Sequence, residues 1–179
     1  MEEPQEPPPP ETPAAPFVPP AIGFHNPLAV RAGLLAAAIA ALLGMIQLPL
    51  MMFWTLVRLL ASGFFAVYIY QRRSGAMVTA REGARLGWIT GIFSFLIATV
   101  LTTIAVAAVA STQGLAAFFR EQVQSQGWQG ISMEEALRYL ETPVGIGFAL
   151  FFSLVLGFAL FSFLSTLGGI VGAKVLERD

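Results

Sequence analysis

Residues 32–70 read AGLLAAAIAALLGMIQLPLMMFWTLVRLLASGFFAVYIY, and the only strongly polar side chains among them are those of Gln47 and Arg58. As a single helix this stretch would be about 58 Å long at about 1.5 Å per residue, whereas the hydrocarbon core of a bilayer is about 30 Å thick. The chain is therefore predicted to cross a membrane twice within it. Pro49 marks the turn, because proline disfavours helix at the preceding residue and interrupts the helical hydrogen bonds.

The start of the first helix is marked by a capping signal just before this stretch. Asn26 is a favoured N-cap, and Pro27 suits the first helical position, where a missing N–H costs nothing. Together with the turn at proline, this signal predicts helices at about 27–47 and 50–71.

Two more apolar stretches complete the predicted membrane domain. Residues 86–110 form a third helix that is long enough to span with some tilt. Thr142 and Pro143 repeat the cap-then-proline start, and the fourth helix runs over 143–174. The predicted fold class is an all-α membrane protein, with four transmembrane helices in two hairpins over residues 27–174.

The composition agrees with this fold and excludes several classes of function. Charged residues make up 12% of the chain and hydrophobic residues 56%, whereas a soluble domain has about 25% charged residues. The net charge is −1 and no basic block is present, so we predict no nucleic-acid partner. The absence of cysteine excludes disulfides, thiolate nucleophiles and sulfur-based metal sites. We interpret the single histidine, His25, as a polar anchor, and predict no metal and no cofactor.

Residues 1–26 are predicted to be a disordered proline-rich tail on the cytoplasmic side. Prolines recur at every third position from Pro4 to Pro19, so in a polyproline II helix they would share one edge. The tail is either a stiff solvated spacer or a ligand for an aromatic-lined groove. It lacks the basic start of a cleavable signal peptide, so the first helix is expected to be an uncleaved anchor.

The distribution of basic residues predicts the orientation in the membrane. One side carries Arg31, Arg72, Arg73, Arg81, Arg85, Lys174 and Arg178, and the other carries only Arg120 and Arg138. By the positive-inside rule, both termini and the central loop are cytoplasmic, including residues 175–179. Residues 111–142 are then an extracytoplasmic, amphipathic helical segment, which either covers the bundle as a lid, lies on the membrane or docks a partner.

Small residues at three- and four-residue steps indicate where helices pack closely, because membrane helices associate through close approach and hydrogen bonds. The candidate packing residues are Gly83, Gly87, Gly91, Ser94 and Ala98 on the third helix and Gly157, Gly168, Gly169 and Gly172 on the fourth. They either pack inside one four-helix bundle, form an interface between copies, or line a pore. The fourth helix has small residues on two different faces, so we expect it to be the better candidate for contact with a second copy.

Arg58 is the only charged residue well inside a predicted span. An arginine at the centre of a membrane helix is unfavourable by about 2.5–3.5 kcal/mol on insertion scales, so such residues are candidates for function. The position also allows its long side chain to extend towards the membrane surface, or to meet Glu134, Glu135 or Glu141 of the outer segment. A tolerated structural role and a role in contacting a solute both remain open.

Three segments of the chain resemble a known group of proteins. They are AVYIYQRRSG at residues 66–75, followed by EGARLGWITG at 82–91, and LGGIVGA at 167–173. The chain resembles uncharacterised bacterial four-helix integral membrane proteins over about residues 27–175. This resemblance implies a multi-pass protein of a bacterial inner membrane and no specific activity. Some such proteins carry a cysteine-rich zinc ribbon before the first helix, which this chain lacks.

The function predicted from the sequence is that of a non-catalytic membrane protein, because the spans supply no Asp, Glu, His or Cys for proton transfer, nucleophilic attack or metal binding. A scaffold or accessory subunit held together by small-residue packing fits best. The alternative is a homo-oligomeric passive pore or small-solute channel. The expected partners are the lipid bilayer and either further copies of the chain or an unidentified membrane protein.

Overall fold

A computed structural model describes residues 21–46, 51–113 and 142–177. These residues form four α-helices: α1 (Pro27–Gly44), α2 (Met51–Ser74), α3 (Ala80–Gln113) and α6 (Pro143–Leu176). All four are long and apolar enough to cross a membrane. The predicted all-α fold with four membrane-spanning helices is therefore confirmed. The proline-rich tail at 1–20, the turn at 47–50 and most of the 111–142 segment lie outside the described residues.

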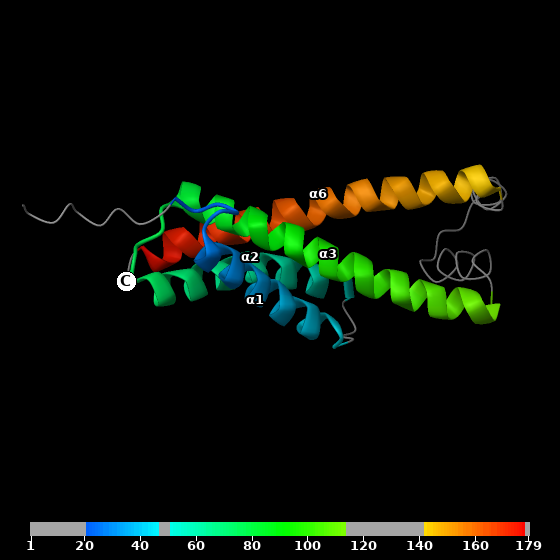
Figure 1. The fold of residues 1–179 in the computed structure, drawn as a ribbon, viewed down its shortest axis with the longest axis horizontal. Helices are drawn as coiled ribbons and strands as arrows, with labels where there is room; N and C mark the ends of the chain where they lie inside the picture. Colours follow the sequence, from blue (N-terminus) through cyan, green and yellow to red (C-terminus); the bar gives the residue numbers. More distant parts are fainter. Residues whose placement is uncertain (1–20, 47–50, 114–141, 178–179) are drawn as a thin grey trace, which may run out of the picture.

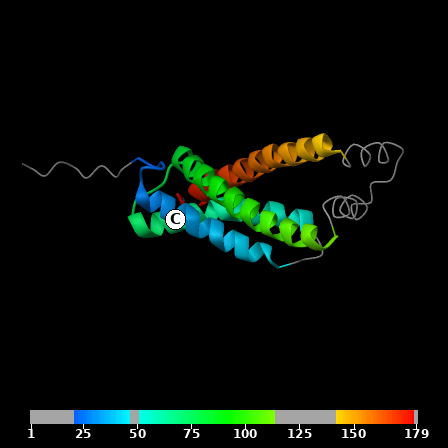
Figure 2. The same ribbon diagram turned by 45° about the vertical axis from the view of Figure 1, so that its right-hand side comes forward.

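The helices differ in length, and this difference shapes the molecule. α3 and α6 have 34 residues each, whereas α1 has 18 and α2 has 24. Figure 1 shows that α1 and α2 cover only one half of the long pair, and that α3 and α6 continue beyond them and diverge. The turned view in Figure 2 shows the same divergence. We call the covered part, which contains the helix ends near Asn26, Ser74, Ala80 and Leu176, the closed half. The open half is formed by residues 94–113 of α3 and 143–161 of α6.

The first helix begins where the sequence predicts and ends earlier than predicted. The Oδ1 atom of Asn26 accepts hydrogen bonds from the backbone N–H groups of Leu28 at 3.0 Å and Ala29 at 3.3 Å, so Asn26 is the N-cap. At the other end the helix stops at Gly44 and not near residue 47. The N–H of Met45 is satisfied by carbonyls of the last turn, so the helix is already capped there.

The third helix begins at Ala80 and not near Leu86, because a capping box precedes it. The N–H and the hydroxyl of Thr79 both donate to Oε2 of Glu82 at 2.9 Å, and the N–H of Glu82 returns a bond of 3.4 Å to the hydroxyl. The helix also continues to Gln113, beyond the predicted end at residue 110. The charged residues at 81–85, assigned to a loop, are thus the first turns of α3.

The ends of the other two helices also extend beyond the predicted positions. α2 continues to Ser74 and stops at Gly75, whose φ of +66° is the left-handed conformation common after helices. α6 starts as predicted, with the hydroxyl of Thr142 accepting from the N–H of Gly145 at 3.0 Å, and continues to Leu176.

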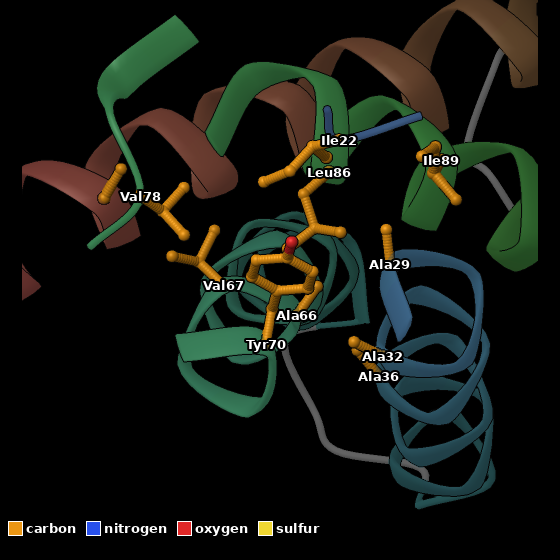
Figure 3. Packing of buried hydrophobic residues seen from close by; sticks show 11 residues of the cluster. Ile22, Ala29, Ala32, Ala36, Ala66, Val67, Tyr70, Val78, Leu86 and Ile89 are labelled. Carbon is orange, nitrogen blue, oxygen red and sulfur yellow. The ribbon is translucent and has the colours of Figure 1, made fainter. Parts of the chain in front are cut away.

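The buried apolar core lies in the closed half. Figure 3 shows its side chains converging from α1, α2, α3 and the segment before α1. Tyr70 lies among them, only 3% exposed, and its hydroxyl accepts a bond of 3.2 Å from the Nδ2 atom of Asn26. The cluster consists of Ile22, Ala29, Ala32, Ala36, Ala66, Val67, Tyr70, Val78, Leu86, Ile89 and Ala173. The residue that caps α1 thereby also connects α1 to α2.

Candidate functional site

Glycines of α3 bring its backbone against the backbone of α6 in the closed half. A Cβ atom added at Gly83 would meet the carbonyl of Gly169, and one added at Gly87 would meet the carbonyl of Ser165. At Gly91 an added Cβ would lie 2.7 Å from the Cα atom of Ser162, closer than such atoms approach in proteins. Because the neighbours are backbone atoms, they cannot move aside as a side chain would.

The small residues of α6 face two neighbours within the same chain. Gly168 lies against the carbonyl of Leu60, and a Cβ at Gly172 would lie 3.1 Å from the Cα atom of Phe64, so both face α2. Gly169 instead faces Gly83 of α3. The small residues of the inner part of α6 therefore contact both α2 and α3, whereas contact of the outer part with a second copy stays a prediction.

Three of the predicted packing residues lie apart from this contact. A Cβ at Gly157 would be 3.5 Å from the ring of Phe95, an ordinary contact. Ser94 and Ala98 line a cavity. The stripe on α3 thus changes its surroundings near Ser94, where the closed half gives way to the open half.

The sequence interpretation missed two small residues of α2 in the same contact. Ser62 is 1% exposed, and a Cβ at Gly63 would meet the carbonyl of Ser165. These two residues form one short pair without the repeated spacing that drew attention to α3. The sequence did contain a sign of this contact, because Ser62 and Gly63 are adjacent small residues in a span whose other side chains are mostly large.

Comparison with protein-family models, curated proteins and solved structures gave no match to this chain. The resemblance to bacterial four-helix proteins therefore stays a prediction, and the site is argued from its own geometry.

Arg58 extends from α2 to the C-terminal end of α1. Its Nη1 atom donates a hydrogen bond of 3.0 Å to the carbonyl of Ala40, and a Cβ added at Gly44 would coincide with the guanidinium. Trp54 supports the same helix end, since its Nε1–H donates to the carbonyl of Leu43 at 3.3 Å. A helix C-terminus carries a partial negative charge, so a cation is stabilised there.

No carboxylate neutralises this guanidinium among the described residues. Their only acidic members are Glu82 and Glu177, and both lie at the ends of helices in the closed half. Glu134, Glu135 and Glu141 lie outside the described residues. Arg58 is half-buried, and its Nε atom is buried with no hydrogen-bond partner.

A cavity of about 670 Å³ lies beside this guanidinium. Its polar lining consists of Arg58, Ser94 and Thr102, and the rest is mostly alanine and apolar side chains. Ser94 is 5% exposed, and its hydroxyl is a second buried group with no hydrogen-bond partner. Two buried polar atoms without partners therefore line or adjoin one cavity in a membrane domain.

A second cavity, of about 550 Å³, lies between α3 and α6 in the open half. Its polar lining comes from Thr99, Thr102 and Thr103 of α3 and Ser153 of α6. It shares Ala98, Thr102 and Phe161 with the first cavity, so the two are neighbours. Within the part of the chain that the structure describes, no three His, Cys, Asp or Glu residues lie together as a metal site would require.

Proposed function

We propose that this multi-pass membrane protein is a non-catalytic scaffold or accessory subunit, whose open half holds an apolar helix of another membrane protein. The observation that carries the proposal is the contrast between its two halves. In one half, α2, α3 and α6 pack backbone to backbone, and α1 packs against α2 and α3. In the other, two long apolar helices diverge around a cavity.

The closed half supports a structural role and disfavours a pore through a single chain. Its glycines are occupied by backbone contacts between α3, α6 and α2, so these helices leave no lumen between them at this level. A passive pore, the alternative function, would have to lie between copies of the chain.

The open half has the chemistry that a membrane helix uses to bind another. Small and hydroxyl-bearing side chains allow close approach and supply hydrogen bonds in a medium that offers none. Ala98, Thr99, Thr103 and Ala107 of α3 and Ser153 of α6 supply such side chains to the cavity between the two helices. A helix of similar character would fit between them.

The residue types of the spans support a non-catalytic role. More than one turn and a half from their ends, the four helices contain one charged side chain, Arg58, and no carboxylate or imidazole. A guanidinium stays protonated in proteins and so cannot serve as a general base. Positioning and binding are the roles that this set of side chains supports.

The test is to extract the tagged protein from its native membrane with the surrounding lipid and to measure the mass of the intact particle. Two variants give the measurement a reference. Thr103→Trp fills the cavity of the open half, whereas Ile104→Trp places the same side chain on the next exposed position, outside that cavity. We expect a stoichiometric second protein that Thr103→Trp removes and Ile104→Trp retains.

The other outcomes of this experiment contradict the proposal. A homo-oligomer free of other proteins would replace the accessory subunit with the pore between copies. A monomer would overturn both. Equal loss of the partner in the two tryptophan variants would show that the cavity is not the contact.

The proposed location is the cytoplasmic membrane of a bacterium, with both chain ends in the cytoplasm. The basic residues support this orientation, since all those of α2, α3 and α6 except Arg58 gather at the helix ends of the closed half: Arg72, Arg73, Arg81, Arg85 and Lys174. The positive-inside rule places such an end in the cytoplasm.

A further inference from the structure

The Arg58 cavity contains more hydrogen-bonding capacity than the described residues use. The guanidinium has five N–H donors, and the structure shows one of them bonded, to the carbonyl of Ala40. The buried Nε atom of Arg58 and the buried hydroxyl of Ser94 have no partner. A buried polar group without a partner is unfavourable by about 1–3 kcal/mol, so unpaired donors beside a cavity indicate a bound group that accepts hydrogen bonds.

The charge of the site determines what kind of acceptor fits. The only described carboxylates, those of Glu82 and Glu177, lie at the opposite end of α2 from Arg58, so the guanidinium is not neutralised within the described residues. A planar guanidinium binds carboxylate and phosphate oxygens with two parallel hydrogen bonds. The ligand should therefore carry an oxyanion.

The walls of the cavity indicate that the ligand is also apolar. Apart from Arg58, Ser94 and Thr102, the cavity is lined by side chains and glycine that offer no charge or hydroxyl: Ala37, Ala40, Ala41, Gly44, Met45, Leu59, Ala98, Leu101, Ala105 and Phe161. Its volume of about 670 Å³ far exceeds that of a single carboxylate or phosphate group. An inorganic anion would leave most of this apolar surface uncovered.

The level of the guanidinium in the bundle suits a lipid head group. It lies over Gly44, the last residue of α1, and α2 begins at Met51, so the chain reverses direction close to it. Non-helical backbone exposed to lipid does not occur within the hydrocarbon region. The end of α1 at Gly44 therefore lies near a membrane surface, where lipid phosphates and carboxylates are found.

From these observations we propose that the Arg58 cavity binds an anionic amphiphile. Its oxyanion lies on the guanidinium of Arg58 within reach of Ser94, and its hydrocarbon part lies along α1 and α3. A phospholipid of the bilayer and a fatty-acid carboxylate share this chemistry. The site does not depend on the proposed scaffold role.

The test uses the full chain, stripped of lipid in a neutral detergent, with native mass spectrometry to count bound molecules. The probes are dioleoyl phosphatidylglycerol, oleate, uncharged dioleoylglycerol and inorganic phosphate. We expect one tightly bound molecule of an anionic probe. The affinity should fall about 10- to 100-fold in Arg58→Gln, as for loss of a charged hydrogen-bonding partner. Tighter binding of phosphatidylglycerol would identify a bilayer phospholipid, and tighter binding of oleate a carboxylate ligand.

Matched variants separate this site from general attraction of lipid to a basic protein. Arg31→Gln removes the same charge from an exposed position on α1 and should leave the affinity unchanged. Gly44→Ala keeps the charge and places a methyl group where the guanidinium lies, so it should weaken binding about tenfold. Gly147→Ala has nothing within 4 Å and serves as its control. The glycine pair gives the answer if Arg58→Gln does not fold.

Four results would overturn the proposal. Dioleoylglycerol that binds as tightly as phosphatidylglycerol would remove the role of the oxyanion, and inorganic phosphate that binds as tightly would remove the role of the apolar walls. Equal weakening by Arg58→Gln and Arg31→Gln would show unspecific charge attraction. If no probe binds and Arg58→Gln instead releases a co-purifying membrane protein, the site takes a partner's carboxylate.

Discussion

The hydroxyl oxygen of Ser62 on α2 lies 3.0 Å from the hydroxyl oxygen of Ser165 on α6, and both residues are almost fully buried. The carbonyl of Leu59 accepts a bond of 2.7 Å from Ser62 and one of 3.3 Å from Ser165. Two helices far apart in the sequence thus satisfy each other's polar groups where lipid offers no partner. Gly63, the residue after Ser62, also lies close to α6, against the carbonyl of Ser165.

Removing this hydroxyl pair should weaken the bundle by a measurable amount. Polar contacts between membrane helices contribute about 0.6 kcal/mol on average and up to about 1.7 kcal/mol. We expect Ser165→Ala and Ser62→Ala each to lower the free energy of unfolding by this order, and the double variant to lose less than the sum. Unfolding in mixed micelles measures these free energies, and Ser111→Ala, at an exposed position, is the control. If the effects of the two single variants add up to that of the double variant, the two hydroxyls do not interact.

Gly87→Leu should prevent folding of the closed half. Even a Cβ atom at this position meets the carbonyl of Ser165, so a leucine requires α3 and α6 to separate. Gly147→Leu places the same side chain on an open stretch of α6 and should leave yield and thermal unfolding unchanged. The yield of monodisperse protein after purification is the measurement. Normal yield with a changed oligomeric state would mean that Gly87 serves an interface between copies.

Asn26→Ala should destabilise the protein more than Tyr70→Phe. The first change removes the N-cap of α1, worth about 1 kcal/mol, together with the side-chain bond to Tyr70. The second removes only the hydroxyl at the far end of that bond, so it should lower the free energy of unfolding by less than the first. Denaturant unfolding followed by circular dichroism ranks the two. A larger effect of Tyr70→Phe would show that the tyrosine hydroxyl contributes more to stability than the N-cap of α1 does.

In lipid-free micelles, Arg58→Leu should raise the unfolding temperature. The guanidinium has no described carboxylate partner, so its removal relieves a burial penalty. This penalty is about 2.5–3.5 kcal/mol at a helix centre and smaller towards the membrane surface. Exposed Arg31→Leu should change stability by less than about 0.5 kcal/mol. With phosphatidylglycerol added, the order of wild type and Arg58→Leu should reverse. Destabilisation of Arg58→Leu without lipid would instead assign the arginine to the packing of α1.

The absence of cysteine makes the orientation directly measurable. Ser74→Cys and Ser111→Cys introduce single thiols at exposed positions at opposite ends of the bundle. In intact cells a membrane-impermeant maleimide should label Ser111→Cys and not Ser74→Cys, and both should react after lysis. The opposite labelling would place the chain ends outside the cytoplasm.

Composition and proline spacing were enough to predict the number of helices, because bilayer thickness sets the length that a span requires. The ends of the helices depend on local hydrogen bonds. The capping box of Thr79 and Glu82, which starts α3, was missed because the neighbouring arginines indicated a loop. The partners of each glycine could not be predicted. A period of three or four residues shows that a face is small, but it does not say which helix covers it, as the division of Gly168 and Gly169 between α2 and α3 illustrates.

The unequal lengths of the helices have a consequence for the surrounding bilayer. At about 1.5 Å per residue, α1 is about 27 Å long and α3 and α6 are about 51 Å long, whereas the hydrocarbon core is about 30 Å thick. One flank of the protein therefore matches the membrane and the other exceeds it. Such hydrophobic mismatch costs fractions of a kcal/mol for each Å, through tilting or local thickening of the lipid. An assembly that surrounded the long flank with protein would remove this deformation, so the lipid would contribute to the association that we propose for that side.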